Sequence, residues 1–176
     1  TAGATSKTQG RDMISYSPNE LLLSSRSDEA FVGWTARGVG AGGVRMLCAV
    51  LPRPDDHHQM NLVMLDGERA FRGFAQSEPS LFLKVPGDLR VRLDPTAPTD
   101  NTSRWRNGTL MIGTDGPYVV VETSDYSGSV VYLRLSDLSI HYDSPPLDCL
   151  FTRWTLLAAQ GRTETELMQV DATADG

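Results

Sequence analysis

Short apolar segments recur along most of the chain, and turn-forming residues separate them. Gly, Pro, Asn and Asp fill the gaps, as in Asp66-Gly67 and Asn107-Gly108. These residue types supply the dihedral angles of tight turns and interrupt strand ladders. Short segments with this punctuation predict an all-β protein, an antiparallel sandwich or a barrel. The expected strands cover residues 13–16 with 21–23, 30–35, 44–51, 60–65, 81–85, 89–93, 109–112, 118–122 and 129–142.

The last of these segments changes phase along its length. Apolar residues occupy odd positions up to Leu135 and even positions from Leu138 onward. A shift of one residue moves the apolar face to the other side of a strand unless an extra residue is inserted. The pattern therefore predicts a β-bulge near residues 136–137.

Two segments allow a helix as well as a strand. Residues 17–20 read Ser-Pro-Asn-Glu, a capping box with Pro at the first helical position, so a short helix could run to Leu23. The alternative there is a strand broken at Pro18. Apolar residues between Leu147 and Ala158 have helical spacing that ends before Gly161, which predicts a second helix. Threonines within it leave open a strand that pairs with residues 162–170.

Composition and length place the chain among ordinary globular domains. It has 176 residues, of which 40% are hydrophobic and 22% charged. Small polar residues at 1–12 predict a flexible N-terminal arm, residues 13–146 form the main domain, and residues 147–176 form a C-terminal extension. No apolar run approaches the ~20 residues that a membrane span needs, so we expect no membrane partner.

The charge balance argues against nucleic-acid binding by this segment, because the net charge is −6. Arg supplies all but two of the 16 basic residues, and its planar, weakly hydrated side chain suits interfaces. Large aromatic residues serve equally as core residues or as interface anchors. The expected interface residues are Trp34, Arg37, Trp105 and Trp154.

Two carboxylates flank a glycine at Asp66-Gly67-Glu68, directly after an expected strand. Such oxygens could hold a hard cation such as Ca²⁺, although six or more ligands are needed and a neighbouring subunit would have to complete the site. The alternative is a tight hairpin turn, which Asp-Gly favours by itself.

Catalytic motifs are absent from the sequence. It has no HExxH, CxxC, P-loop or Gly-x-Ser-x-Gly pattern. His141 and Asp143 share one face of an expected strand, but no nucleophile is tied to them. The Asp-Asp-His-His run at 55–58 is typical of a solvated turn, since neighbouring strand residues point to opposite faces. We therefore expect a protein that is not an enzyme. Cys48 lies in an apolar run, and the sequence leaves open whether it meets Cys149.

Three stretches carry a family resemblance. Residues 14–21 read Ile-Ser-Tyr-Ser-Pro-Asn-Glu-Leu, residues 32–39 read Val-Gly-Trp-Thr-Ala-Arg-Gly-Val ahead of a strand that ends at Pro52, and Gly-Pro-Tyr-Val-Val-Val opens residues 116–145. In order and pattern they resemble the shell domain of coat proteins of small icosahedral plant RNA viruses, the sobemovirus and tombusvirus groups. The resemblance implies an eight-stranded jelly roll, with short helices and flexible arms, that self-assembles into a shell around RNA.

The resemblance also implies partners, a cofactor and a location. Ca²⁺ would lie between subunits at Asp66, with Glu68 near it. Partners would be copies of the chain, with or without other coat subunits, and viral RNA held mostly by a basic arm that residues 1–12 do not supply. The protein would be found in the virion, and in the host cytoplasm during assembly. Residues 147–176 would be an arm that docks on a neighbour or the start of an outer domain.

Two alternatives use different residues. A β-sandwich attachment or carbohydrate-binding module would act through Arg104, Trp105 and Arg106. A hydrolase would use Asp55, His57, His58 or His141.

Overall fold

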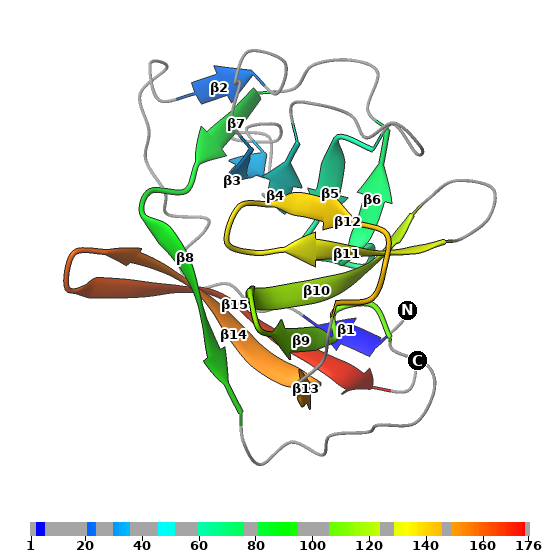
Figure 1. Cartoon of the computed structure of the whole chain (residues 1–176). Coiled ribbons are helices and arrows are strands. Elements are labelled where there is room, and N and C mark those ends of the chain that lie inside the picture. The colour runs from blue at the N-terminus through cyan, green and yellow to red at the C-terminus, as the bar shows by residue number, and fades with distance from the viewer. Residues whose placement is uncertain are drawn as a thin grey trace.

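A computed structural model describes residues 3–5, 21–23, 30–35, 46–51, 60–75, 81–94, 106–123, 129–145 and 149–174. These residues form fifteen β-strands (Figure 1). The predicted all-β class is confirmed. The short helices expected beside the strands are not found in these ranges, so that part of the prediction is wrong there.

Most strands are short, as the spacing of the turn residues predicts. They are β1 (Gly3–Thr5), β2 (Leu21–Leu23), β3 (Phe31–Thr35), β4 (Leu47–Val50), β5 (Leu62–Met64), β6 (Arg72–Phe74), β7 (Leu81–Lys84), β8 (Asp88–Leu93), β9 (Leu110–Gly113), β10 (Gly116–Thr123), β11 (Val130–Arg134), β12 (Ser139–His141), β13 (Cys149–Phe151), β14 (Arg153–Gln160) and β15 (Thr163–Ala174).

The larger sheet has the order β12-β11-β10-β6-β5-β4-β3-β7-β2, with β9 paired to β10 and β13 paired to β9. Strands that follow one another in sequence pair antiparallel from β3 to β6 and from β9 to β12. Short connections allow only this antiparallel pairing. The β6 and β10 strands run parallel where Arg72 lies opposite Glu122.

The smaller sheet has the order β1-β15-β14-β8. Its β14–β15 hairpin projects beyond the body of the molecule, with β8 alongside (Figure 1). Gly87 precedes β8 with a φ of +92°, and a Cβ there would collide with the carbonyl oxygen of Ala159. A glycine is therefore required where the chain turns into the smaller sheet.

The two sheets share one hydrophobic core. The larger sheet contributes Leu47, Val63 and Leu133, and the smaller one contributes Leu156 and Met168, all of them fully buried. One face of each sheet thus packs against the other sheet, which is how proteins built from sheets bury their apolar residues.

Residues 149–160 form two strands, so the helix predicted between Leu147 and Ala158 is wrong, and the strand alternative is confirmed. The β14 strand pairs with β15 over its whole length. The misleading helical spacing arises because both faces of the strand are buried at Leu156, Leu157 and Ala158. Apolar residues at consecutive positions hide the alternation that identifies a strand.

The β-bulge predicted near residues 136–137 is also wrong. The chain reverses there, so that β11 and β12 form a hairpin with Leu133 opposite Ile140. Leu138 closes the turn with a φ of +57°. The change of apolar phase therefore marks a turn between two strands. At the other ambiguous segment, residues 21–23 form β2 and pair with β7, and residues 17–20 lie outside the described ranges.

Residues from both the expected N-terminal arm and the expected C-terminal extension form strands of the smaller sheet. Residues 3–5 of the expected N-terminal arm form β1, which pairs with β15. The expected extension at 147–176 supplies Leu156, Leu167 and Met168 to the shared core.

Shortening Leu156 to Ala should lower the free energy of unfolding by about 2–5 kcal/mol, because its side chain is fully buried in the shared core. Leu81→Ala is the matched control, since Leu81 is 45% exposed, and it should cost less than about 1 kcal/mol. Chemical denaturation measures both values. Equal losses would show that β14 does not pack in the common core.

Candidate functional site

The expected calcium ligands lie in the loop between β5 and β6, which runs from residue 65 to 71 and is longer than the tight two-residue turn considered from the sequence. Asp66 is fully buried, and its Oδ1 accepts a hydrogen bond of 3.0 Å from the backbone amide of Leu47. Glu68 is exposed. Asp66 thus ties the loop to the start of β4.

No group of three or more His, Cys, Asp or Glu side chains able to hold a metal ion occurs in the described ranges. A calcium site here would need ligands beyond Asp66 and Glu68.

Two of the four expected interface residues lie in the chain's own core. Trp34 is 6% exposed and Trp154 is 3% exposed. Nε1 of Trp154 donates a hydrogen bond of 2.8 Å to the carbonyl oxygen of Gly108, so the indole joins β14 of the smaller sheet to the turn that precedes β9 of the larger one. Neither ring forms an exposed anchor on this chain. Arg37 and Trp105 lie outside the described residues, as do residues 55–58 and Arg104.

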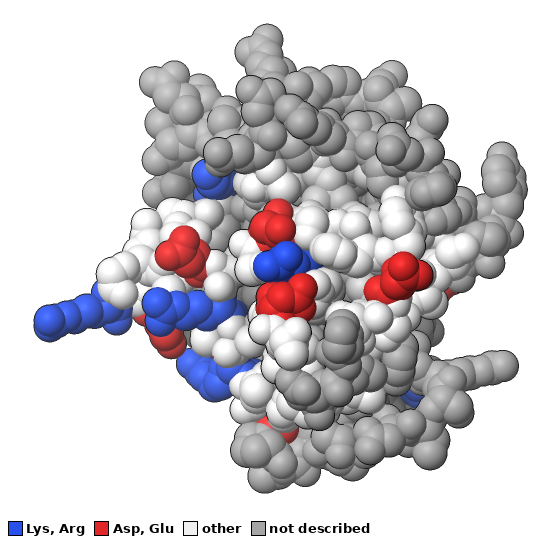
Figure 2. Space-filling view, viewed as in Figure 1, with Lys and Arg blue, Asp and Glu red and all other residues white. Residues whose placement is uncertain are grey.

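A polar cluster that sequence reasoning missed lies where the turns of the β9–β10 and β11–β12 hairpins meet. The hydroxyl of Tyr118 donates to Asp115 Oδ2 at 2.5 Å, and the ring of His141 stands edge-on to Tyr118 at 5.3 Å. Ser139 Oγ lies 2.8 Å from His141 Nε2 and 2.6 Å from Asp137 Oδ1. Acidic and basic side chains meet on this face near the centre of Figure 2.

Hydrogen bonding sets the protonation of this cluster. The bond from Tyr118 lowers the pKa of Asp115, and the same bond raises the pKa of Tyr118. Burial acts to raise the pKa of Asp137, but hydrogen bonds from the hydroxyl and amide of Ser139, together with the nearby side chains of Arg134 and His141, outweigh it, so the pKa is lowered. Both carboxylates are therefore ionised at neutral pH.

The cluster orients Ser139 the wrong way for a nucleophile. A serine hydroxyl has one proton, and an ionised Asp137 can only accept it. The Nε2 of His141 must then donate to Ser139 Oγ, whereas a general base would have to accept the proton from it. The sequence suggested a dyad of His141 with Asp143. In the structure, the hydrogen-bonding partner of His141 Nε2 is Ser139.

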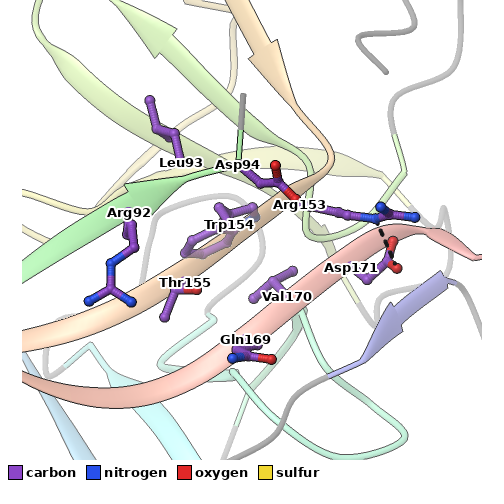
Figure 3. Close-up of a pocket in the computed structure, with 9 residues that line it drawn as sticks. All are labelled: Arg92, Leu93, Asp94, Arg153, Trp154, Thr155, Gln169, Val170 and Asp171. Atoms are coloured by element: carbon purple, nitrogen blue, oxygen red, sulfur yellow. Dashed lines mark ion pairs between the residues drawn. The ribbon is translucent and has the colours of Figure 1, made fainter. Parts of the chain in front are cut away.

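A groove of about 520 Å³ opens on the smaller sheet (Figure 3). Arg153 and Asp171 form an ion pair of 3.4 Å on one side of it. Its other polar side chains are carried by β8, by Asp94 directly after it, and by the paired strands β14 and β15. The lining residues are Arg92, Leu93, Asp94, Arg153, Trp154, Thr155, Gln169, Val170 and Asp171.

Ion pairs cross the outer face of the same sheet. Nη1 of Arg90 lies 3.3 Å from Glu164 Oε1, and Nη1 of Arg92 lies 3.9 Å from Glu166 Oε2. Leu157 of β14 lies opposite both Arg90 and Glu166 and is buried. Exposed ion pairs contribute only about 0–1 kcal/mol, so we assign these arginines mainly to covering Leu157 with their aliphatic stems. Basic residues gather over β8 and the β14–β15 hairpin in Figure 2.

Both cysteines are free, which answers the pairing question left open by the sequence. Burial raises the pKa of the Cys48 thiol to about 12, and the negative charge of Asp66 acts in the same direction. The Sγ of Cys48 lies 3.7 Å from the Sδ of Met64. Cys48 is thus an unreactive core thiol, and Cys149 is exposed.

Comparison with protein-family models gives no match, and searches of curated proteins and of solved structures give none either. Within the described ranges, no helix is long and apolar enough to cross a membrane.

Iodoacetamide at pH 8 should modify Cys149 in the native protein and leave Cys48 unmodified. Alkylation needs the thiolate, and a thiol with a pKa of about 12 holds on the order of one thiolate in 10⁴ molecules at that pH. Mass spectrometry counts the labels, and the denatured chain should take two. Equal native labelling of both residues would contradict the burial of Cys48.

Proposed function

We propose that this chain is a self-assembling structural subunit, and specifically a coat-protein subunit that forms a shell around viral RNA. The observation that carries the proposal is the open edge of the smaller sheet. Within the described residues, β8 is the last strand and pairs only with β14. An unpaired strand edge offers a row of backbone donors and acceptors to another chain.

The chemistry of the polar cluster supports assembly over catalysis. Nε2 of His141 must donate a hydrogen bond to Ser139, so this histidine is not the general base that the hydrolase alternative would need. Polar groups that bond to one another on the surface fix the turns of the two hairpins. The sheets and their edges are then the surfaces through which the molecule would contact a partner.

The coat-protein proposal includes a finer topology, the eight-stranded jelly roll. A jelly roll places sequence-distant strands side by side. The pairs of β3 with β7 and of β8 with β14 are of that kind, whereas β3 to β6 and β9 to β12 follow a meander. The jelly roll therefore stays a prediction, and self-assembly is proposed on the open edge.

Calcium, RNA and the virion belong to the same proposal. Glu68 is exposed and could reach an ion shared with a neighbour, whereas buried Asp66 already accepts a hydrogen bond from Leu47. RNA would be held by a basic segment outside this sequence, because the net charge of the chain is −6.

Purified protein should form large, uniform particles by light scattering and negative-stain electron microscopy. Chelation of Ca²⁺ should loosen them, because clustered carboxylates at subunit contacts would then repel one another. Glu68→Gln should make the particles insensitive to the chelator. A monomer with and without Ca²⁺ would contradict the shell proposal, and particles indifferent to chelation would contradict its calcium part.

The groove on the smaller sheet favours a second candidate, a carbohydrate-binding module. Arginine, aspartate, threonine and glutamine side chains line it, and such groups hydrogen-bond to sugar hydroxyls. The site first considered for such a module, at residues 104–106, stays a prediction, because Arg106 alone of the three is described.

If this second candidate is right, a glycan panel should give at least one ligand, and Arg153→Ala should weaken its binding about tenfold or more, as expected for the loss of a charged hydrogen bond. Arg134→Ala is the control, because Arg134 lies 3.9 Å from Asp137 of the polar cluster and does not line the groove. Calorimetry measures both. Equal affinities for the two variants would exclude the groove as the site.

A further inference from the structure

The edge of β8 has a defined hydrogen-bonding pattern. The amide of Asp94 donates to the carbonyl oxygen of Arg153 at 3.2 Å. Opposed residues of an antiparallel pair alternate between bonded and non-bonded along the strands. Even-numbered residues of β8 therefore direct their backbone groups toward β14. The backbone groups of Leu89, Val91 and Leu93 point to the outer edge.

That outer edge is open in the part of the chain that is described. No backbone hydrogen bond from another strand reaches Leu89, Val91 or Leu93 there. The side chains of Leu89 and Val91 pack partly against the shared core, and Leu93 is 37% exposed. As far as the described strands go, the edge thus combines three unused donor–acceptor pairs with an apolar face that ends at solvent.

We propose that β8 pairs antiparallel with β8 of a second copy, with Arg90 of both chains at the two-fold axis. This inference rests on the self-assembly proposed above and names the contact that makes it. Leu89 of each copy lies opposite Val91 of the other and exchanges backbone hydrogen bonds with it. The smaller sheets of the two copies then join into one continuous sheet.

Charge and the length of β8 together select this register. Residues that lie opposite each other in an antiparallel pair have their side chains on the same face of the sheet. Side chains alternate between the two faces along a strand, so opposite residues of two identical strands differ by an even number of positions. The two-fold axis must therefore pass through a residue of β8 or its flanks and not between two residues. With Arg90 at the axis, Asp88 lies opposite Arg92 twice. With Val91 at the axis, Arg90 would face Arg92 and Asp88 would face Asp94, which places like charges together four times. An axis at Leu89 or at Arg92 would also bring opposite charges together, but it would pair a shorter part of β8 than an axis at Arg90 does.

The axis itself brings two arginines together, and the structure already supplies their counterion. Nη1 of Arg90 lies 3.3 Å from Glu164 of the same chain. Each Arg90 therefore reaches the axis as one half of an ion pair, which lowers the repulsion between the two copies.

Proline at position 91 tests the contact without disturbing the sheet within one chain. Val91→Pro removes an amide that faces the outer edge, and proline is tolerated in edge strands at such positions. Sedimentation velocity on the full chain should show that this variant no longer forms the dimer. Val91→Ala keeps the amide and is the matched control, so it should still dimerise. Circular dichroism should confirm that both variants are folded.

A charge exchange tests the register and stays informative if the proline variant fails to fold. Arg92→Asp and Asp88→Arg should each weaken dimerisation about tenfold, because each replaces two attractive pairs with two repulsive ones. The double variant restores the pairs in reverse and should regain most of the wild-type affinity. A double variant as weak as the single ones would overturn the register.

The outcomes separate this contact from self-assembly in general. A wild-type chain that assembles, with Val91→Pro assembling equally well, overturns the β8 contact and leaves the structural-subunit proposal standing. A wild-type chain that stays monomeric at all concentrations overturns both.

Discussion

Burial of one apolar face from each sheet in a single core is the constraint on which the rest of this structure depends. Fully buried residues such as Leu47, Leu133 and Leu156 come from both sheets and meet in it. Trp154 strengthens the junction because its indole is buried and its nitrogen bonds to Gly108. The turns, the buried carboxylate of Asp66 and the glycine at position 87 all serve to bring these strands into register.

The same arrangement leaves specific surfaces available. A sheet that is covered on its inner face still has an outer face and two edges. On the outer face, Arg90 and Arg92 cover Leu157 and pair with glutamates of β15, so the apolar side chain is shielded from water while the charged groups stay exposed. At the edge, β8 alternates apolar and charged residues. The charges discourage unspecific pairing, and they give a partner with matching charges a preferred register.

The candidate sites show how local geometry limits chemistry. Ser139, His141 and Asp137 are the residue types of a hydrolytic triad, yet the hydroxyl of Ser139 donates its hydrogen bond to Asp137 and not to His141. Asp66 is a carboxylate beside a glycine, as a calcium ligand would be, yet the structure uses one of its oxygens to hold the amide of Leu47. Either function needs the right residue types, but which atoms these residues hydrogen-bond to decides whether the function is possible.

The sequence by itself determined the all-β class and the place of most strands, because Gly, Pro and Asp-Gly signals act over a few residues. Only the tertiary structure decided that residues 153–160, which form β14, are a strand and not a helix. Its apolar residues at 156–158 mimic a helix, and their burial on both faces depends on β8 and the larger sheet. The hairpin turn at Leu138 and the pairing of Ser139 with His141 likewise depend on strands that meet after folding. Local patterns fix local dihedral angles, whereas contacts between distant residues need the assembled sheets.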